Sequence, residues 1–220
     1  MLNYLILFCM IFSYISYIKL SILNVPLFYV YAPFGLLVFF YHSLKDNFKI
    51  HYDYYYYFVL LFCIAFIFLL SFLINQSGDF FYFKEVLQFN IVSFFSAYFI
   101  VHFYFVLKKK KNYNSYLLVD KMILMVSCAV FFQLAISFIA LINIKFSNFI
   151  FGFIDSAILF EDTLDSYREF RMVAIGTPFF GSAILNCFVL LLISTSFKYT
   201  KYTKSFIFLW FMISLLGMLS

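Results

Sequence analysis

Residues 54–74 read YYYYFVLLFCIAFIFLLSFLI, a run of 21 residues without one charged side chain. An α-helix rises about 1.5 Å per residue, so a run of this length crosses the hydrocarbon core of a bilayer, which is about 30 Å thick. Tyrosines such as those that open the run are typical of the aromatic belt at a membrane interface. This stretch therefore predicts a transmembrane helix.

The rest of the chain has the same character. Of its 220 residues, 66% are hydrophobic and 11% are charged, whereas soluble domains are about half apolar and carry about 25% charged residues. Backbone groups in lipid must form hydrogen bonds within their own segment, so the apolar runs should be helices. We predict an all-α integral membrane protein, a single polytopic membrane domain with about seven transmembrane helices. The predicted spans are 2–18, 20–41, 54–74, 86–107, 118–142, 178–197 and 206–220.

Further features of the sequence bear on the shape of the spans and on the ligands that the chain could bind. Pro26 and Pro33 predict that the second span is kinked or partly re-entrant. The four cysteines lie singly in apolar runs, so we expect neither a metal site nor disulfides, and no cofactor. The lysines fall in short loops between spans, so the net charge of +5 does not indicate nucleic acid. Polar residues within the spans, such as Gln133 and Asn186, are expected to bond between helices.

The distribution of positive charge predicts the orientation, because lysine and arginine concentrate in cytoplasmic loops. The loops at 42–53, 108–117 and 198–205 hold nine lysines, four of them in the run KKKK at 108–111. The alternate loops hold five cationic residues. We therefore predict that the amino terminus is cytoplasmic and that residues 143–177 lie on the outer side of the membrane.

This outer segment has the pattern of an amphipathic helix. Its apolar residues recur every three or four positions, at Phe153, Ala157, Phe160, Leu164 and Tyr167. Acidic residues fall on the opposite side of the same helix, at Asp155, Asp162, Asp165 and Glu169. The pattern predicts one outer helical loop that lies on the membrane surface.

Arg168 and Arg171 lie near the carboxyl end of this segment. They are the only two arginines of the chain, whose other thirteen cationic residues are lysines. Thr177 is a good N-cap residue and Pro178 suits the first position of a helix, so the sixth span should begin at the outer surface. A helix N-terminus attracts anions, and arginine adds a planar fork suited to phosphate. Gly176 would let a ligand approach the backbone closely.

We therefore predict an anion site formed by these two arginines, Gly176 and Thr177, with Lys84 of the fourth span on the same side of the membrane. Two alternatives stay open. The arginines would otherwise pair with Asp165 and Glu169 at helical spacing, and Lys84 would be an ordinary interfacial lysine.

The stretch REFRMVAIGTPFFGSAIL, residues 168–185, resembles a segment of bacterial O-antigen polymerases and O-antigen ligases. In these families an arginine, a glycine and a proline lead into a helix. Family members usually have ten or more spans, and the span after this helix ends in a Ser-Arg motif, where this chain stops at Ser220. The resemblance thus implies that residues 1–220 are the amino-terminal half of a larger transporter-like or polymerase fold, or the product of a truncated reading frame.

The resemblance also implies an activity. The full-length protein would be a glycosyltransferase of the bacterial inner membrane that polymerises undecaprenyl-diphosphate-linked oligosaccharides at its outer face for O-antigen or capsule. Its partners would be membrane lipids and other polysaccharide-assembly proteins, without nucleic acid, metal or nucleotide sugar. Arg168 and Arg171 would hold the donor diphosphate. The catalytic residues stay unknown, with Glu161, Asp165 or a residue beyond Ser220 as the general base.

Two other functions stay open. An O-antigen ligase would use the same donor with a different acceptor. A flippase or transporter would carry the lipid-linked sugar without covalent chemistry. Transport favours ionisable groups at mid-membrane, whereas those of this chain lie mostly at the boundaries of the spans.

Overall fold

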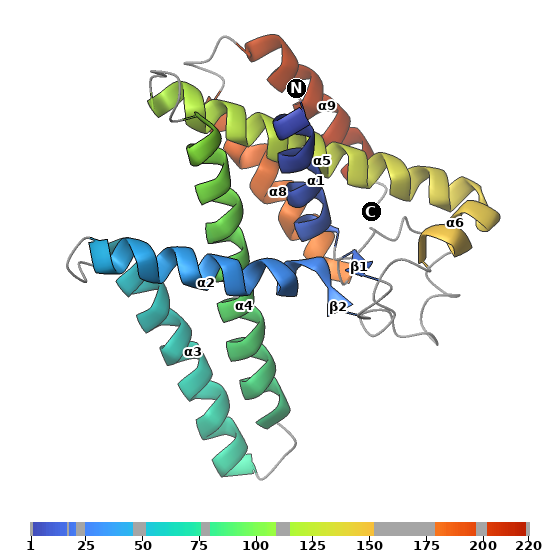
Figure 1. Cartoon of the computed structure of the whole chain (residues 1–220). Helices are drawn as coiled ribbons and strands as arrows, with labels where there is room; N and C mark the ends of the chain where they lie inside the picture. The colour runs from blue at the N-terminus through green and yellow to red at the C-terminus, as the bar shows by residue number, and fades with distance from the viewer. Residues whose placement is uncertain are drawn as a thin grey trace. The chain divides into compact units, whose positions relative to one another are not determined.

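The structure, a computed structural model, describes residues 2–16, 18–20, 25–45, 52–75, 80–108, 115–151, 179–196 and 202–218. These residues are almost entirely helical, as Figure 1 shows. The elements are α1 Leu2–Ile15, β1 Lys19–Leu20, β2 Val25–Pro26, α2 Leu27–Lys45, α3 Tyr52–Asn75, α4 Phe80–Lys108, α5 Ser115–Ile142, α6 Ile144–Phe151, α8 Phe179–Ser196 and α9 Thr203–Gly217.

Within the described residues, four helices are long and apolar enough to cross a membrane. They contain the spans Leu27–Lys45, Tyr54–Ile74, Leu87–Leu107 and Leu118–Ile142. Three further apolar helices, α1, α8 and α9, have shorter apolar segments of 10–17 residues. The protein is therefore a helical membrane protein. Residues 54–74 form one of these candidate spans, as predicted, whereas the predicted number of seven spans is not confirmed.

The second predicted span differs from the structure at its start. Residues 20–41 were expected to be apolar helix, but α2 begins at Leu27. The two short strands pair antiparallel before it, with Lys19 opposite Pro26, and the Leu27 N–H donates to the Ile18 carbonyl at 2.9 Å. Pro26 has no N–H to donate, which suits the end of a strand directly before a helix. Pro33 lies inside α2.

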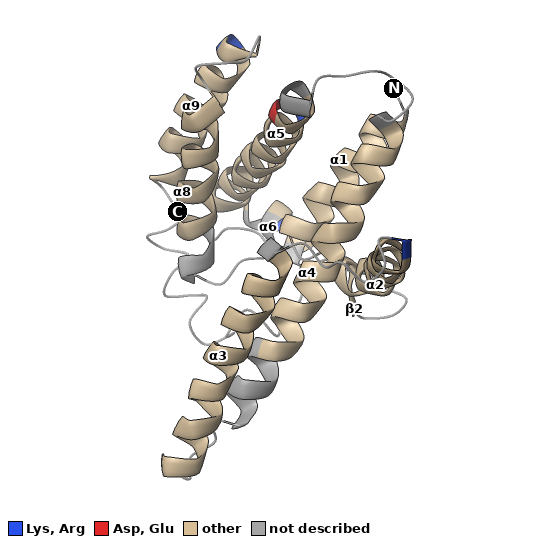
Figure 2. Cartoon of the chain, turned by 90° about the vertical axis from the view of Figure 1, so that its left-hand side faces the viewer, with Lys and Arg blue, Asp and Glu red and all other residues tan. Residues whose placement is uncertain are grey.

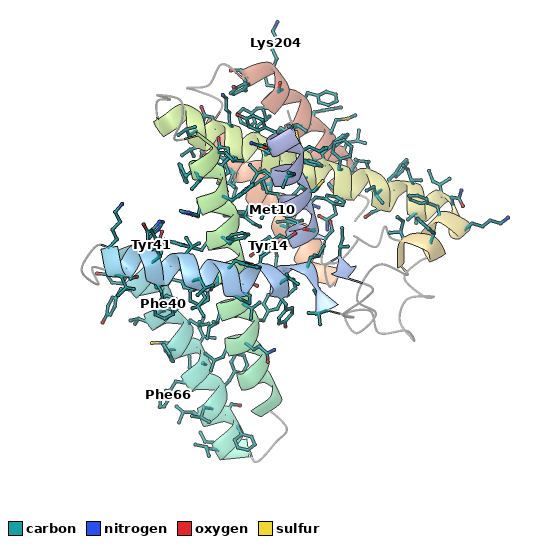
Figure 3. All side chains as sticks on the ribbon, in the orientation of Figure 1. Met10, Tyr14, Phe40, Tyr41, Phe66 and Lys204 are labelled. Carbon is teal, nitrogen blue, oxygen red and sulfur yellow. The ribbon has the colours of Figure 1, made fainter. Side chains whose placement is uncertain are left out.

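Charged residues lie near the ends of the described helices, whereas the middle parts of these helices are uncharged (Figure 2). Lys204, for example, projects from the start of α9 (Figure 3). Along α3 the surface is apolar and exposed, and Phe66 points away from the helix with 57% of its area accessible (Figure 3). In a bilayer such a surface faces lipid.

The chain divides into two compact units. One comprises Met1–Leu27 with Phe103–Ser220, and the other Phe28–His102. In the first unit α5 is the central helix, in contact with α1, α6, α8 and α9. Its core is mostly apolar, and the largest fully buried aliphatic side chains there are Leu7, Val130, Leu134, Val189, Ile193 and Ile213. In the second unit aromatic side chains join α2, α3 and α4.

Candidate functional site

The predicted anion site falls largely outside the described residues. Arg168, Arg171, Gly176 and Thr177 lie in the stretch 152–178, which the structure does not describe. Lys84 lies in α4, but its side chain is also outside the described part. The helix that should follow the site is present, because α8 begins at Phe179, close to the predicted start at Pro178. The anion site stays a prediction.

The two general-base candidates, Glu161 and Asp165, lie in the same stretch. The outer amphipathic helix predicted around them is likewise outside the described residues. Immediately before this stretch, α6 covers Ile144–Phe151. At its start, the Phe146 N–H donates a hydrogen bond to the Asn143 side chain, 3.2 Å long. An asparagine in this position caps a helix N-terminus.

The described residues contain a polar cluster of their own, where α2 meets α4. His42 of α2 shares a hydrogen bond between its Nδ1 and the Tyr98 hydroxyl of α4, 2.8 Å long. One turn further along α4, the His102 ring lies with its centre 4.7 Å from that of His42, at an interplanar angle of 65°. Tyr98 and His102 are four residues apart and therefore share one face of α4. Both histidines are half-buried.

A close backbone contact brings these two helices together. A Cβ atom added to Gly35 of α2 would lie 1.8 Å from the Phe95 carbonyl oxygen of α4. The helix backbones thus touch at a point where no other residue fits, a common device in membrane helix packing. The Ser96 hydroxyl adds a hydrogen bond to the Phe28 carbonyl across the same interface.

The contacts between α2 and α4 extend to both sides of this point. Phe28 packs against Phe89, Gly35 meets Phe95, and His42 meets His102. The two helices cross steeply, as Figure 1 shows, so these contacts gather around the crossing at Gly35 and Phe95.

Aromatic side chains surround the polar cluster. Phe39, one turn before His42, packs against Tyr54, Phe94, Phe95 and Tyr98, with ring centres 5.4–6.1 Å apart. Such edge-to-face pairs contribute about 0.5–1.5 kcal/mol each beyond the area that they bury. These rings hold Tyr98 in place and thereby fix the side chain that meets His42.

The first unit has buried polar groups of a different kind. On α5, the hydroxyl of Ser127 donates to the Ile123 carbonyl at 2.8 Å, and that of Ser137 to the Gln133 carbonyl at 2.9 Å. These bonds stay within the helix. Asn186 of α8 is buried against α9, where a Cβ at Gly217 would lie 3.3 Å from its Nδ2. These groups serve helix packing and present no reactive set.

The sequence did not predict that His42 and His102 meet. By the predicted orientation, His42 falls in a cytoplasmic loop and His102 near the inner end of the fourth predicted span, both on the side opposite to the arginines. Hydropathy gives no signal for this pair, because the meeting of the two rings depends on where α2 and α4 cross, at Gly35 and Phe95. Within the described residues, no three His, Cys, Asp or Glu side chains gather in one place.

Comparison with known proteins adds no further information. No protein-family model matches the sequence, and no curated protein or solved structure matches it significantly.

Proposed function

We propose that this protein binds undecaprenyl-diphosphate-linked oligosaccharides at the outer face of the bacterial inner membrane and acts in their polymerisation. The observation that carries the proposal is the sequence around Arg168 and Arg171, the only arginines of the chain, placed before Gly-Thr-Pro. The start of α8 at Phe179 supports it, because a helix then begins eight residues after Arg171 in the sequence. Backbone N–H groups and arginine forks together suit a diphosphate.

The proposed topology has seven spans with the amino terminus in the cytoplasm. Four long and three shorter apolar helices among the described residues overlap the seven predicted spans, which supports this number. The lysine run at 108–111 then lies inside, and the arginines lie outside.

In the proposed reaction a sugar hydroxyl of the incoming unit attacks the anomeric carbon of the donor glycan. The bond between that carbon and the diphosphate oxygen breaks, and a new glycosidic bond forms. The hydroxyl proton passes to a general base, for which Glu161 and Asp165 are candidates. Arg168 and Arg171 stabilise the negative charge that develops on the departing lipid diphosphate.

Two other functions share the same donor site. A ligase would transfer the glycan to a different acceptor, and a flippase would move the lipid-linked sugar without forming a bond. The boundary position of the ionisable residues favours an enzyme over a transporter. A glycan that grows in length distinguishes a polymerase from both.

The test measures binding of undecaprenyl diphosphate to the purified chain in lipid nanodiscs. Arg171→Lys keeps the charge and loses the fork, so it should weaken binding almost as much as Arg171→Ala. A lost charge-assisted contact of about 1.5–3 kcal/mol corresponds to a roughly ten- to hundredfold change. Lys145→Ala is the control, because Lys145 is an exposed cation that is predicted on the same side.

The outcomes separate the proposal from its alternative. If the arginines only form exposed pairs with Asp165 and Glu169, each pair is worth less than about 1 kcal/mol, and lysine should substitute freely. Wild-type affinity in Arg168→Lys and Arg171→Lys, singly and together, would therefore exclude the diphosphate site. Glycan length in cells, read on a gel with protein level checked by blot, then separates the polymerase from the flippase.

A further inference from the structure

We propose that His42 and His102 form a binding site for a divalent transition-metal cation that joins α2 to α4. The site is independent of the diphosphate site proposed above. Its two imidazoles come from helices that the Gly35 contact holds together, and their ring centres are 4.7 Å apart. Imidazole is a ligand that Zn²⁺, Cu²⁺ and Ni²⁺ prefer in proteins.

The separation of the rings suits a shared cation. With a metal–nitrogen bond of about 2.0–2.1 Å, a metal lies about 3.2 Å from the centre of each coordinating ring. Two ring centres 4.7 Å apart then subtend an angle of about 95° at the metal, near the tetrahedral value that Zn²⁺ adopts. The distance between the ring centres is therefore compatible with one ion bound by both rings.

Tyr98 supplies the support that metal-binding histidines usually have. A ligating imidazole commonly donates its other ring N–H to a neighbouring oxygen, which fixes the ring and its tautomer. When His42 donates from Nδ1 to the Tyr98 hydroxyl at 2.8 Å, its Nε2 carries the lone pair that binds the metal. The aromatic neighbours of Tyr98, including Phe39 and Tyr54, hold that hydroxyl in place.

The site has open positions and a route for the ion. Both histidines are half-buried and lie near the carboxyl ends of their helices, where water of the membrane interface would complete the coordination. The described residues bring no third histidine, cysteine or carboxylate to this place, so they supply two ligands. Such an ion bridges the two helices, and exchangeable water would fill the remaining positions of its coordination shell. A cation bound there would stabilise the contact between α2 and α4.

The experiment measures Zn²⁺ binding by calorimetry on the purified chain in detergent, with an affinity tag that contains no histidine. Melting temperature with and without Zn²⁺ is the second readout, and each variant is compared with its own metal-free sample. We expect one ion per chain and a rise in melting temperature. His42→Gln and His102→Gln should each abolish both effects. Tyr98→Phe should weaken binding about ten- to hundredfold, as loss of a supporting hydrogen bond does.

Two controls make the result specific. Cys63→Ser removes an exposed thiol of the same unit, a side-chain type that can bind Zn²⁺. This change should leave Zn²⁺ binding unchanged. His51→Gln removes the third histidine of the chain, which lies outside the described residues. The proposal is overturned if the wild-type protein binds no Zn²⁺. It is also overturned if binding survives either His42→Gln or His102→Gln, or if it depends on Cys63 or His51 alone.

Discussion

Gly35→Ala tests the contact on which the second unit depends. The new methyl group would lie 1.8 Å from the Phe95 carbonyl oxygen, whereas ordinary contact begins at 3.4 Å. The obstacle is backbone, which cannot rotate away as a side chain can. The two helices must therefore separate by about 1.6 Å at this point, the difference between these distances.

The cost follows from the contacts that such a separation loosens. Phe39 makes three ring contacts from α2 to α4, with Phe94, Phe95 and Tyr98. Each contributes about 0.5–1.5 kcal/mol, and a gap of about 1 Å removes up to half of a dispersion contact. Overpacking strain destabilises the protein by about a further 1–3 kcal/mol. The higher helix propensity of alanine offsets up to about 1 kcal/mol of this loss. We expect a net loss of about 2–3 kcal/mol in the free energy of unfolding.

The assay combines unfolding by SDS in mixed micelles with hydrogen exchange of peptides from α2 and α4. Gly217→Ala in α9 is the matched control, since its methyl group would lie 3.3 Å from the end of the Asn186 side chain and needs a shift of only a few tenths of an ångström. It should change stability by less than about 1 kcal/mol. Equal stability of the two variants, with unchanged exchange in α2 and α4, would refute the close contact at Gly35.

Two further predictions concern the first unit. Tyr104→Phe removes the hydrogen bond from a buried hydroxyl to the Leu118 carbonyl, 2.7 Å long; it should lower the free energy of unfolding by about 0.5–1.5 kcal/mol in the SDS titration, and an unchanged value would contradict the bond. Leu134→Ala in the centre of α5, where the side chain is 1% exposed, should cost about 2–5 kcal/mol. Leu191→Ala, at a position 66% exposed on α8, is its control and should cost far less. Equal losses for the two leucines would show that α5 is not the centre of this unit.

The sequence predicts the spans well where lipid alone determines them. The apolar run at 54–74 coincides with the span Tyr54–Ile74, because an uncharged run of this length has no other low-energy form in a bilayer. The start of the second span was wrong. Hydropathy does not distinguish a short strand pair from a helix end, and here the pairing of Lys19 with Pro26 delays the helix to Leu27.

The polar cluster could not be predicted from hydropathy, because it depends on which helices touch and at what register. A single glycine, Gly35, determines that register, and glycine has no pattern of its own in an apolar run. The predicted anion site, by contrast, was derived without knowing which helices touch. Arg168 and Arg171 were found from their residue type and from the helix start that follows, and this hypothesis now depends on the binding experiment.

The pairing of α2 with α4 has a consequence for biosynthesis. Phe95 follows Gly35 by 60 residues, and the whole of α3 is made between them. At a synthesis rate of about 5–20 residues per second, α2 leaves the ribosome about 3–12 s before the segment of α4 that it contacts. During that interval the backbone at Gly35 and the ring of His42 have lipid, translocon or chaperone as their neighbours. Insertion factors that shield a polar side chain within a nascent span would therefore act on α2 before any other helix of this unit is complete.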